Sequence, residues 1–326
     1  MENFLKQIIC CPDCSGELLS LDNALRCEKC SITFPAEEDI QILFSKKMQQ
    51  ESTYKVYLEE YEKIEKETVE SYLTDRSYIN MTPWEKAKHL ILGGSSSLKA
   101  RRNATRGQMV ALSFCQFIGP TEGLTILDIG CREGLVLSFL MGGGNKVGLD
   151  ISPFHLKYIK KKGNSGVAGF AERLPFKDNS FDLVISSHVL EHVLRPEAMT
   201  AEIERVMRPT GKAVIEVPFG ETDESLSRID EDTNRIVMKY PSGSHKKRRT
   251  ALHLRNFEDE KDLEVLFPHL KLTRKRFHFY KLKRNVPWWV KFSLRPTNRL
   301  SVDSLKSYFP SVFSPRNIIT EFISKE

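Results

Sequence analysis

Two neighbouring segments constrain the fold more than any other feature: TILDIGCREG at 125–134 and VGLDIS at 147–152. In the first segment, a short apolar run is followed by two glycines and then by a second apolar run. This order is typical of a strand, a tight turn and a helix. The second segment contains another apolar run, which ends at Asp150. Together they predict the first β-α-β unit of a doubly wound parallel sheet, a fold that binds ligands at the carboxyl ends of its strands.

The same residues indicate what kind of ligand to expect. A glycine turn lets the backbone approach a ligand closely, and the helix after it offers free N–H groups to a carboxylate or phosphate. Asp150, at the end of the second strand, can accept hydrogen bonds from a ribose diol. A dinucleotide fingerprint also requires glycine where the chain has Arg132 and Leu135, so binding of NAD is disfavoured.

Two segments further along the chain carry a family resemblance. They are AERLPFKDNSFDLVISSHVLEHV at 171–193 and RVMRPTGKAVIEVPFG at 205–220. In sequence and in order they resemble the class I S-adenosylmethionine-dependent methyltransferases, and among these the large group with an LPFxDxSFDxV segment. The resemblance covers roughly residues 101–284. It implies a Rossmann-like sheet of seven strands and S-adenosylmethionine as the cofactor, while an unrelated doubly wound domain is the alternative.

The resemblance also implies which residues contact the cofactor. Asp128, Gly130 and Gly134 would shape the pocket for its methionine part, Asp150 would hold the ribose hydroxyls, and Ile151 would pack on the adenine. The further expected contacts are Ala171 through its backbone, Glu172, and Ser187 near the methionine part.

The chain departs from the family pattern at two of these places. Relatives usually have glycine at the position of Arg132, so this side chain could narrow the pocket or offer a charge. They also have an acid, which contacts the adenine amino group, at the position of Phe170. In this chain the backbone of Ala171 and the side chain of Glu172 must then supply the adenine contacts.

Candidates for catalysis follow from the chemistry of methyl transfer. The protein needs mainly to align and dehydrate the reactants, and an oxygen or nitrogen acceptor often also needs a base. The predicted catalytic residues are His188, His192 and His253. Helical spacing would put His188 and His192 on one face of a helix. The segment also resembles a metal-binding pattern of some O-methyltransferases, so the alternative is a divalent ion held by His188, Glu191, His192 and His253.

Four cysteines near the start of the chain form a second candidate site. Cys11, Cys14, Cys27 and Cys30 make two C-x-x-C knuckles at zinc-ribbon spacing, separated by a predicted hairpin. A module of about 44 residues could hardly fold on its own core, whereas structural Zn2+ contributes about 10–16 kcal/mol. The segment that contains the second knuckle resembles the zinc ribbon of methyltransferase activator proteins. Disulfides and a rubredoxin-like iron site are the alternatives.

Composition and hydrophobic runs argue against a membrane-spanning or a secreted protein. The chain has 326 residues, 40% hydrophobic and 28% charged, which is ordinary for a globular protein. No apolar run approaches the roughly 20 residues that a membrane-spanning helix needs, and the start shows no signal peptide. We therefore expect a cytoplasmic protein, and peripheral contact with a membrane is the alternative that stays open.

The C-terminal region is strongly basic. Between 271 and 300 there are ten Lys or Arg and no acid, interleaved with aromatic residues. The last two strands of the sheet are expected at its start, near 271–282. The segment 285–300 would suit an anionic membrane surface or lipid-linked substrate, an RNA, or simple packing on the domain.

These features divide the chain into four expected parts. They are a zinc-ribbon module at 1–44, a helical linker or lid at 45–100, the methyltransferase domain at 101–284 and a basic aromatic extension at 285–326. The expected function is transfer of a methyl group to an oxygen or nitrogen atom of a small-molecule, glycan or lipid-linked substrate. The alternatives are methylation of an RNA base and a catalytically silent partner that keeps the fold; the sequence does not set the oligomeric state.

Overall fold

The computed structural model describes most of the chain. The described residues are 2–37, 40–59, 61, 108, 110–142, 144–219, 227–230, 235–238, 254–257, 259–278, 281–282, 313–314 and 317–325. His253 and the segment 285–300 lie outside them, and so do residues 60 and 62–100 of the expected helical linker. Within the described parts, no helix combines the length and the apolar character that crossing a membrane requires.

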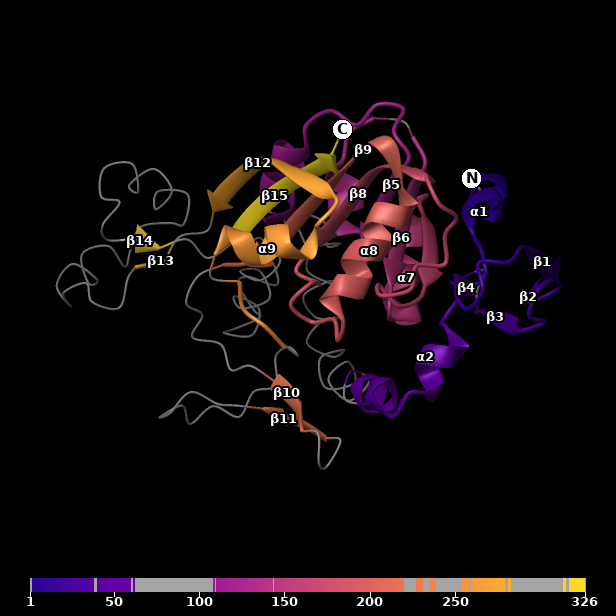
Figure 1. Ribbon diagram of the computed structural model, residues 1–326. Coiled ribbons are helices and arrows are strands. Elements are labelled where there is room, and N and C mark those ends of the chain that lie inside the picture. Colours follow the sequence, from indigo (N-terminus) through magenta and orange to yellow (C-terminus); the bar gives the residue numbers. More distant parts are fainter. Residues whose placement is uncertain are drawn as a thin grey trace, which may run out of the picture.

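One mixed sheet of eleven strands runs through the molecule, in the order β1-β2-β3-β4-β7-β6-β5-β8-β9-β15-β12 (Figure 1). The N-terminal strands are β1 (Leu18–Leu21), β2 (Ala24–Cys27), β3 (Thr33–Glu37) and β4 (Ile40–Ile42). The strands that follow are β5 (Ile126–Ile129), β6 (Lys146–Asp150), β7 (Ser165–Ala168), β8 (Phe181–Ser187), β9 (Met207–Pro218), β12 (Leu270–His278) and β15 (Asn317–Ser324). Strands β5 to β9 are parallel, as predicted for a doubly wound sheet.

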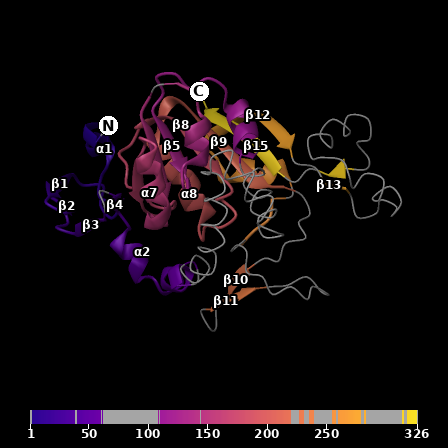
Figure 2. The ribbon, with the colours of Figure 1, turned by 180° about the vertical axis from the view of Figure 1, so that it is seen from behind.

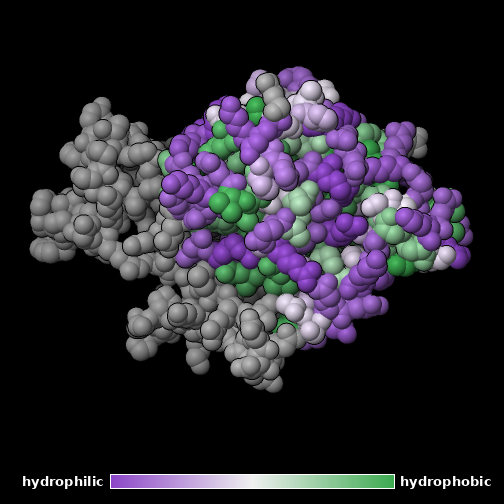
Figure 3. Space-filling model, in the orientation of Figure 1, coloured by the Kyte–Doolittle hydropathy of each residue, from purple (hydrophilic) through white to green (hydrophobic). Residues whose placement is uncertain are grey.

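Helices cover both faces of the parallel strands, which explains why those strands read as continuous apolar runs. On one face, α8 (Pro196–Val206) and α9 (Glu260–Leu266) pack against alternate residues such as Leu127 and Val184 (Figure 1). On the other face, α6 (Leu135–Phe139) and a helix over 110–118 pack against Ile126 and Leu183. Between β6 and β7 runs α7 (Pro153–Lys161). Hydrophilic residues cover most of the described surface in Figure 3, as expected when the apolar faces of the sheet are buried.

The final strand of the sheet lies much later in the chain than predicted. β15 (Asn317–Ser324) inserts between β9 and β12 and is antiparallel to both. Three of its residues in a row, Ile318 to Thr320, are buried. The expectation that the last two strands of the sheet both lie near 271–282 is therefore wrong, because β12 is the only strand of this sheet that falls there. A boundary at residue 284 would separate β15 from the sheet that it completes.

The N-terminal module is continuous with this sheet. β4 pairs in parallel with β7, where Gln41 lies opposite Val167 and Ile42 opposite Ala168. The backbone N–H of Leu43 extends the pairing by donating to the carbonyl of Ala168 at 2.8 Å. Seen from behind in Figure 2, β1 to β3 again lie at the end of the sheet opposite β12. The module therefore shares one hydrophobic core with the larger domain, to which α1 (Glu2–Ile8) also contributes.

Two short sheets and a broken helix complete the described structure. β10 (Ser227–Asp230) pairs with β11 (Arg235–Met238), and β13 (Lys281–Leu282) pairs with β14 (Phe313–Ser314). The linker begins with α2 (Lys46–Gln50), turns at Glu51, where the backbone is extended, and is helical again over 52–59. The described start of the expected helical linker thus consists of two helical segments with a break at Glu51.

Candidate active site and cysteine cluster

The turn after β5 is built from left-handed backbone. Gly130, Arg132 and Gly134 have φ values of 70°, 46° and 69°. A side chain at position 130 would clash, because a Cβ there would lie 2.1 Å from the Cγ2 of Val189. Arg132 occupies a conformation that favours glycine, which accounts for the glycine expected there from the family resemblance.

Two acids lie at the carboxyl ends of β5 and β6. Oδ2 of Asp150 accepts a hydrogen bond from the backbone N–H of Arg132 at 2.7 Å, and Oδ1 accepts one from that of Ser152 at 2.9 Å. These donors fix the orientation of the carboxylate. Asp128 is also buried, and among the described residues its Oδ2 has no hydrogen-bond partner. Burial, followed by the charge of Asp150, raises the pKa of Asp128.

An unsatisfied buried oxygen of this kind costs free energy. A hydrogen-bond donor on a bound ligand, such as an ammonium group, would satisfy it. The amino-acid and ribose parts of S-adenosylmethionine therefore fit three features of this region. They are the glycine-lined turn, the oriented carboxylate of Asp150 on β6 and the buried oxygen of Asp128 on β5.

The residues expected to contact the adenine of the cofactor pack against the N-terminal part of the chain. Ile151 belongs to an apolar cluster with Tyr54 and Phe170, whose rings meet edge to face at 5.4 Å. Oε1 of Glu172 accepts hydrogen bonds from the hydroxyl of Tyr54 at 3.3 Å and from the backbone N–H of Leu194 at 3.0 Å. The pKa of Glu172 is raised, mainly by burial. Ala171 is buried beside it.

His188, which follows β8, is held between two fully buried carboxylates. Its Nδ1 lies 3.1 Å from Oε1 of Glu191, and its Nε2 lies 3.6 Å from Oε1 of Glu216 on β9. About a third of the His188 side chain is exposed, while Glu191 and Glu216 are inaccessible. Burial by itself lowers the pKa of His188, but the two carboxylates together raise it to about 10.

Asn317 on β15 completes this network. Its Nδ2 donates to Oε1 of Glu216 at 2.9 Å and lies 3.0 Å from Nε2 of His188. An amide N–H can donate only to an unprotonated Nε2, whereas a charged imidazolium requires the amide to turn its oxygen toward the ring. The orientation of Asn317 therefore depends on the charge of His188. Ser187 joins the network by donating to Oε2 of Glu216 at 2.7 Å.

The other predicted catalytic residues are placed differently. His188 has φ of 59° and the residues after it form turns, so the expectation of a helix that carries His188 and His192 is wrong. Nε2 of His192 lies 3.8 Å from the same Glu191 oxygen that His188 contacts. His253 lies outside the described residues. Two neighbours that the sequence did not reveal shape this region, Glu216 and Asn317, because each reaches the site from a distant strand.

Arg255 is a further residue that the sequence did not single out. Its guanidinium donates to the carbonyls of Leu190 at 2.7 Å and Val193 at 2.6 Å. It therefore fixes the turn that carries Glu191. The only indication in the sequence was that Arg255 lies two residues after His253. That position does not predict hydrogen bonds to the carbonyls of Leu190 and Val193.

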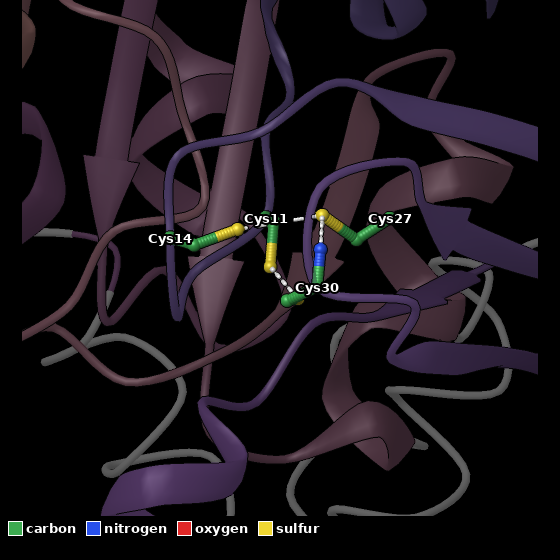
Figure 4. Close-up of side chains that lie close together, drawn as sticks. All are labelled: Cys11, Cys14, Cys27 and Cys30. Carbon is green, nitrogen blue, oxygen red and sulfur yellow. Dashed lines mark hydrogen bonds between the residues drawn. The ribbon is translucent and has the colours of Figure 1, made fainter.

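The four predicted cysteines converge on one point (Figure 4). Their sulfur atoms all lie within 4.8 Å of one another, with 3.6 Å between Cys11 and Cys30 and 3.4 Å between Cys14 and Cys27. A tetrahedral zinc site with Zn–S bonds near 2.3 Å places its sulfurs about 3.8 Å apart. All seven cysteines are described and none is in a disulfide. The group can hold a metal ion, and it is the one cluster of this kind within the described residues.

Comparison with known proteins agrees with this geometry. Residues 127–215 match the model of a family described as a methyltransferase domain. An uncharacterized methyltransferase of Mycolicibacterium gilvum (strain PYR-GCK) is 35% identical over 117 residues, which are 33% of this chain and 46% of the relative. Another, of Mycobacterium marinum (strain ATCC BAA-535 / M), is 34% identical over 134 residues, or 38% of this chain and 48% of the relative. The matches thus span about half the length of these relatives.

A solved structure of an S-adenosylmethionine-dependent methyltransferase from Mesorhizobium loti is also similar. The alignment covers 64% of this chain and 95% of that one, with 18% sequence identity and a TM-score of 0.42. The family match defines the class of protein: the chain contains a methyltransferase domain. More particularly, this domain belongs to the class I S-adenosylmethionine-dependent methyltransferases.

Proposed function

We propose that the protein binds S-adenosylmethionine across the carboxyl ends of β5 and β6 and catalyses methyl transfer to an oxygen or nitrogen atom. The observation that carries the proposal is the pairing of a left-handed glycine turn with the oriented carboxylate of Asp150 and the buried oxygen of Asp128. Asp150 would accept the ribose hydroxyls and Asp128 would face the methionine part. When bound, the cofactor supplies an electrophilic methyl group.

An oxygen or nitrogen acceptor must lose a proton during transfer, and the candidate that we favour as the base is His188, directly after β8. Because Glu191 and Glu216 raise the pKa of His188 to about 10, the ring can act as a base only in its neutral form, in which Nδ1–H donates to Glu191 and Nε2 is the accepting atom. His192 and His253 are the further candidates for this role. We expect His253→Ala to lower turnover strongly and leave cofactor affinity within about twofold; unchanged turnover would exclude His253.

The substrate class that we favour is a small molecule, a glycan or a lipid-linked intermediate. Support comes from the cysteine module, whose surface carries little excess positive charge. Arg26 and Lys29 are offset there by Glu17, Asp22 and Glu28, all of them exposed. A surface that follows a nucleic-acid backbone would need a clear excess of cations.

The cysteine cluster is proposed to bind structural Zn2+. Four thiolates in a closed tetrahedron leave no open position for a substrate, which is the arrangement of structural zinc sites. Because β4 joins the module to β7, metal binding would stabilise the edge of the methyltransferase sheet as well as the module itself.

The proposed function can be tested by two measurements on the full-length protein. Isothermal calorimetry with S-adenosylhomocysteine should detect binding, and Asp150→Ala should abolish most of it. Transfer of labelled methyl groups from S-adenosylmethionine to fractionated cell extract should label the lipid or small-molecule pool. Labelled RNA would overturn the substrate class alone, whereas binding without any transfer would indicate a catalytically silent partner.

A further inference from the structure

The turn over 189–194, which follows β8 and His188, is buried but has no regular secondary structure. Leu190 and Val193 are 1% and 5% exposed. Within the turn, the one backbone hydrogen bond among the described residues runs from the N–H of His192 to the carbonyl of Val189 at 2.8 Å. Its other buried carbonyls need partners from elsewhere, because an unpaired buried polar group costs free energy.

Two consecutive residues from a distant part of the chain supply these partners. The N–H of Leu254 donates to the carbonyl of Glu191 at 2.8 Å. The guanidinium of Arg255 donates to three further carbonyls of the turn, those of Leu190 at 2.7 Å, Val193 at 2.6 Å and Leu194 at 3.4 Å. Among the described residues Arg255 forms no ion pair, so its donors serve the main chain of this turn.

The backbone that carries Arg255 is anchored to the sheet. Phe257, two residues later, is 2% exposed and belongs to the hydrophobic core on the α8 face of the sheet. It also forms a parallel bridge with Phe219, directly after β9. The guanidinium therefore holds the turn from a fixed position.

The 189–194 turn in its place contacts two parts of the proposed cofactor site. Val189 packs on the glycine turn, since a Cβ at Gly130 would lie 2.1 Å from the Cγ2 of Val189. At the other end, the N–H of Leu194 donates to Oε1 of Glu172 at 3.0 Å. A displaced turn would leave space beside the glycine turn and would remove a donor from Glu172.

We propose that Arg255 is a positioning residue for the cofactor site, because it holds the 189–194 turn against the glycine turn and Glu172. Through Glu191, whose Oε1 lies 3.1 Å from Nδ1 of His188, it holds the candidate base as well. Lysine cannot replace it. An ammonium group donates from one point, whereas a guanidinium reaches separate carbonyls from two nitrogens in a fixed geometry.

This inference rests on the proposed function, because it assumes that the nucleotide lies beside the glycine turn. The test measures the affinity of the zinc-loaded full chain for S-adenosylhomocysteine by calorimetry. Arg255→Lys keeps the charge but leaves buried carbonyls without donors, so binding should weaken about tenfold. Hydrogen exchange read by mass spectrometry should become faster over 189–194, while β5 and β8 stay protected.

Arg276→Lys is the matched control for this substitution. Arg276 is half-buried like Arg255, and its guanidinium also donates to a backbone carbonyl, that of Ser113. It lies on β12, at the edge of the sheet. Its affinity for the nucleotide should stay within about twofold of the wild type, with unchanged exchange over 189–194.

Chemical rescue separates positioning from general damage. In Arg255→Ala, millimolar guanidinium should restore nucleotide affinity severalfold, whereas the same concentration of ammonium should not. Equal rescue by both ions, or weaker binding in Arg255→Lys without faster exchange over 189–194, would overturn the inference.

The failure of this inference can be told apart from the failure of the proposed function. If the wild type binds S-adenosylhomocysteine while Arg255→Lys and Arg255→Ala both stay within about twofold of it, the inference is wrong and the proposed function stands. If the wild type itself fails to bind, both are wrong.

Discussion

The cysteine cluster and the proposed cofactor site at the carboxyl ends of the strands differ in how their residues are brought together. The cysteines lie within twenty residues of chain, on two knuckles on either side of one hairpin, and their convergence follows from spacing alone. The proposed cofactor site and its neighbours draw residues from strands, turns and the linker helix between Tyr54 and Asn317. Local geometry determines the first site, whereas the order of strands in the sheet determines the second.

The two sites also differ in what surrounds their charges. The thiolates form a closed group in which each sulfur faces the others. At the proposed cofactor site, buried acids lie on neighbouring strands; Glu216 is satisfied by Asn317 from a distant strand, whereas one oxygen of Asp128 has no partner among the described residues. We therefore expect substitutions among the cysteines to affect folding first, and substitutions at the proposed cofactor site to affect ligand binding or turnover first.

The largest effect is expected from Cys27→Ser, which removes one thiolate from the cluster. Structural zinc contributes about 10–16 kcal/mol in small zinc domains, so its loss should unfold the module and expose the edge of β7. Elemental analysis should find little or no zinc, and thermal denaturation should show a much lower midpoint.

Cys10→Ser is the matched control for that experiment. Cys10 is buried and its thiol pKa is raised to about 11 by burial, so it is a protonated, inert neighbour of the cluster. This variant should keep its zinc. Equal zinc content in Cys10→Ser and Cys27→Ser would contradict the assigned cluster.

A smaller effect, confined to the second site, is expected from Asp150→Ala. The carboxylate would no longer accept ribose hydroxyls, and the loss of about 3 kcal/mol corresponds to roughly a hundredfold weaker binding of S-adenosylhomocysteine. Zinc content should not change, because the cysteines do not depend on this turn. Loss of zinc together with loss of the nucleotide would mean that the two sites are not separable.

The same difference explains which predictions from sequence succeeded. The first β-α-β unit, the parallel sheet and the hairpin between the knuckles follow from local runs, and the structure contains all three. β15 could not be placed, because a short apolar strand after a long basic segment gives no sign of the strands it joins. For the same reason no role could be predicted for Glu216 or Asn317.

The turn after β8 shows a second limit. The spacing of His188 and His192 suits a helix, yet His188 adopts left-handed backbone and the chain turns instead. Arg255, more than sixty residues away, holds this turn through the carbonyls of Leu190 and Val193. Periodicity cannot reveal a conformation that a distant guanidinium stabilises.

Glu216→Gln is expected to have an intermediate effect that appears in turnover. The amide keeps the shape of the side chain but removes one of the two charges that raise the pKa of His188. The apparent pKa of the turnover profile should fall, and kcat near neutral pH should rise severalfold, because more of His188 is then in the unprotonated form that can accept a proton. Nucleotide affinity should be nearly unchanged. A profile identical to that of the wild type would exclude His188 as the titrating group.

The smallest effect concerns the pH dependence of stability. The pKa of His188 is about 10 in the folded protein, above the ordinary value of about 6.5 for an unfolded histidine. A group with a raised pKa contributes its full stabilisation below about pH 6.5 and loses it as the pH rises toward 10. Urea unfolding of the wild type and of His188→Gln should therefore differ most near pH 6 and converge near pH 10. Partial exposure of His188 screens its charge and keeps the difference small. A difference that grows with pH would mean that His188 is neutral in the folded state and that the amide of Asn317 donates to its Nε2.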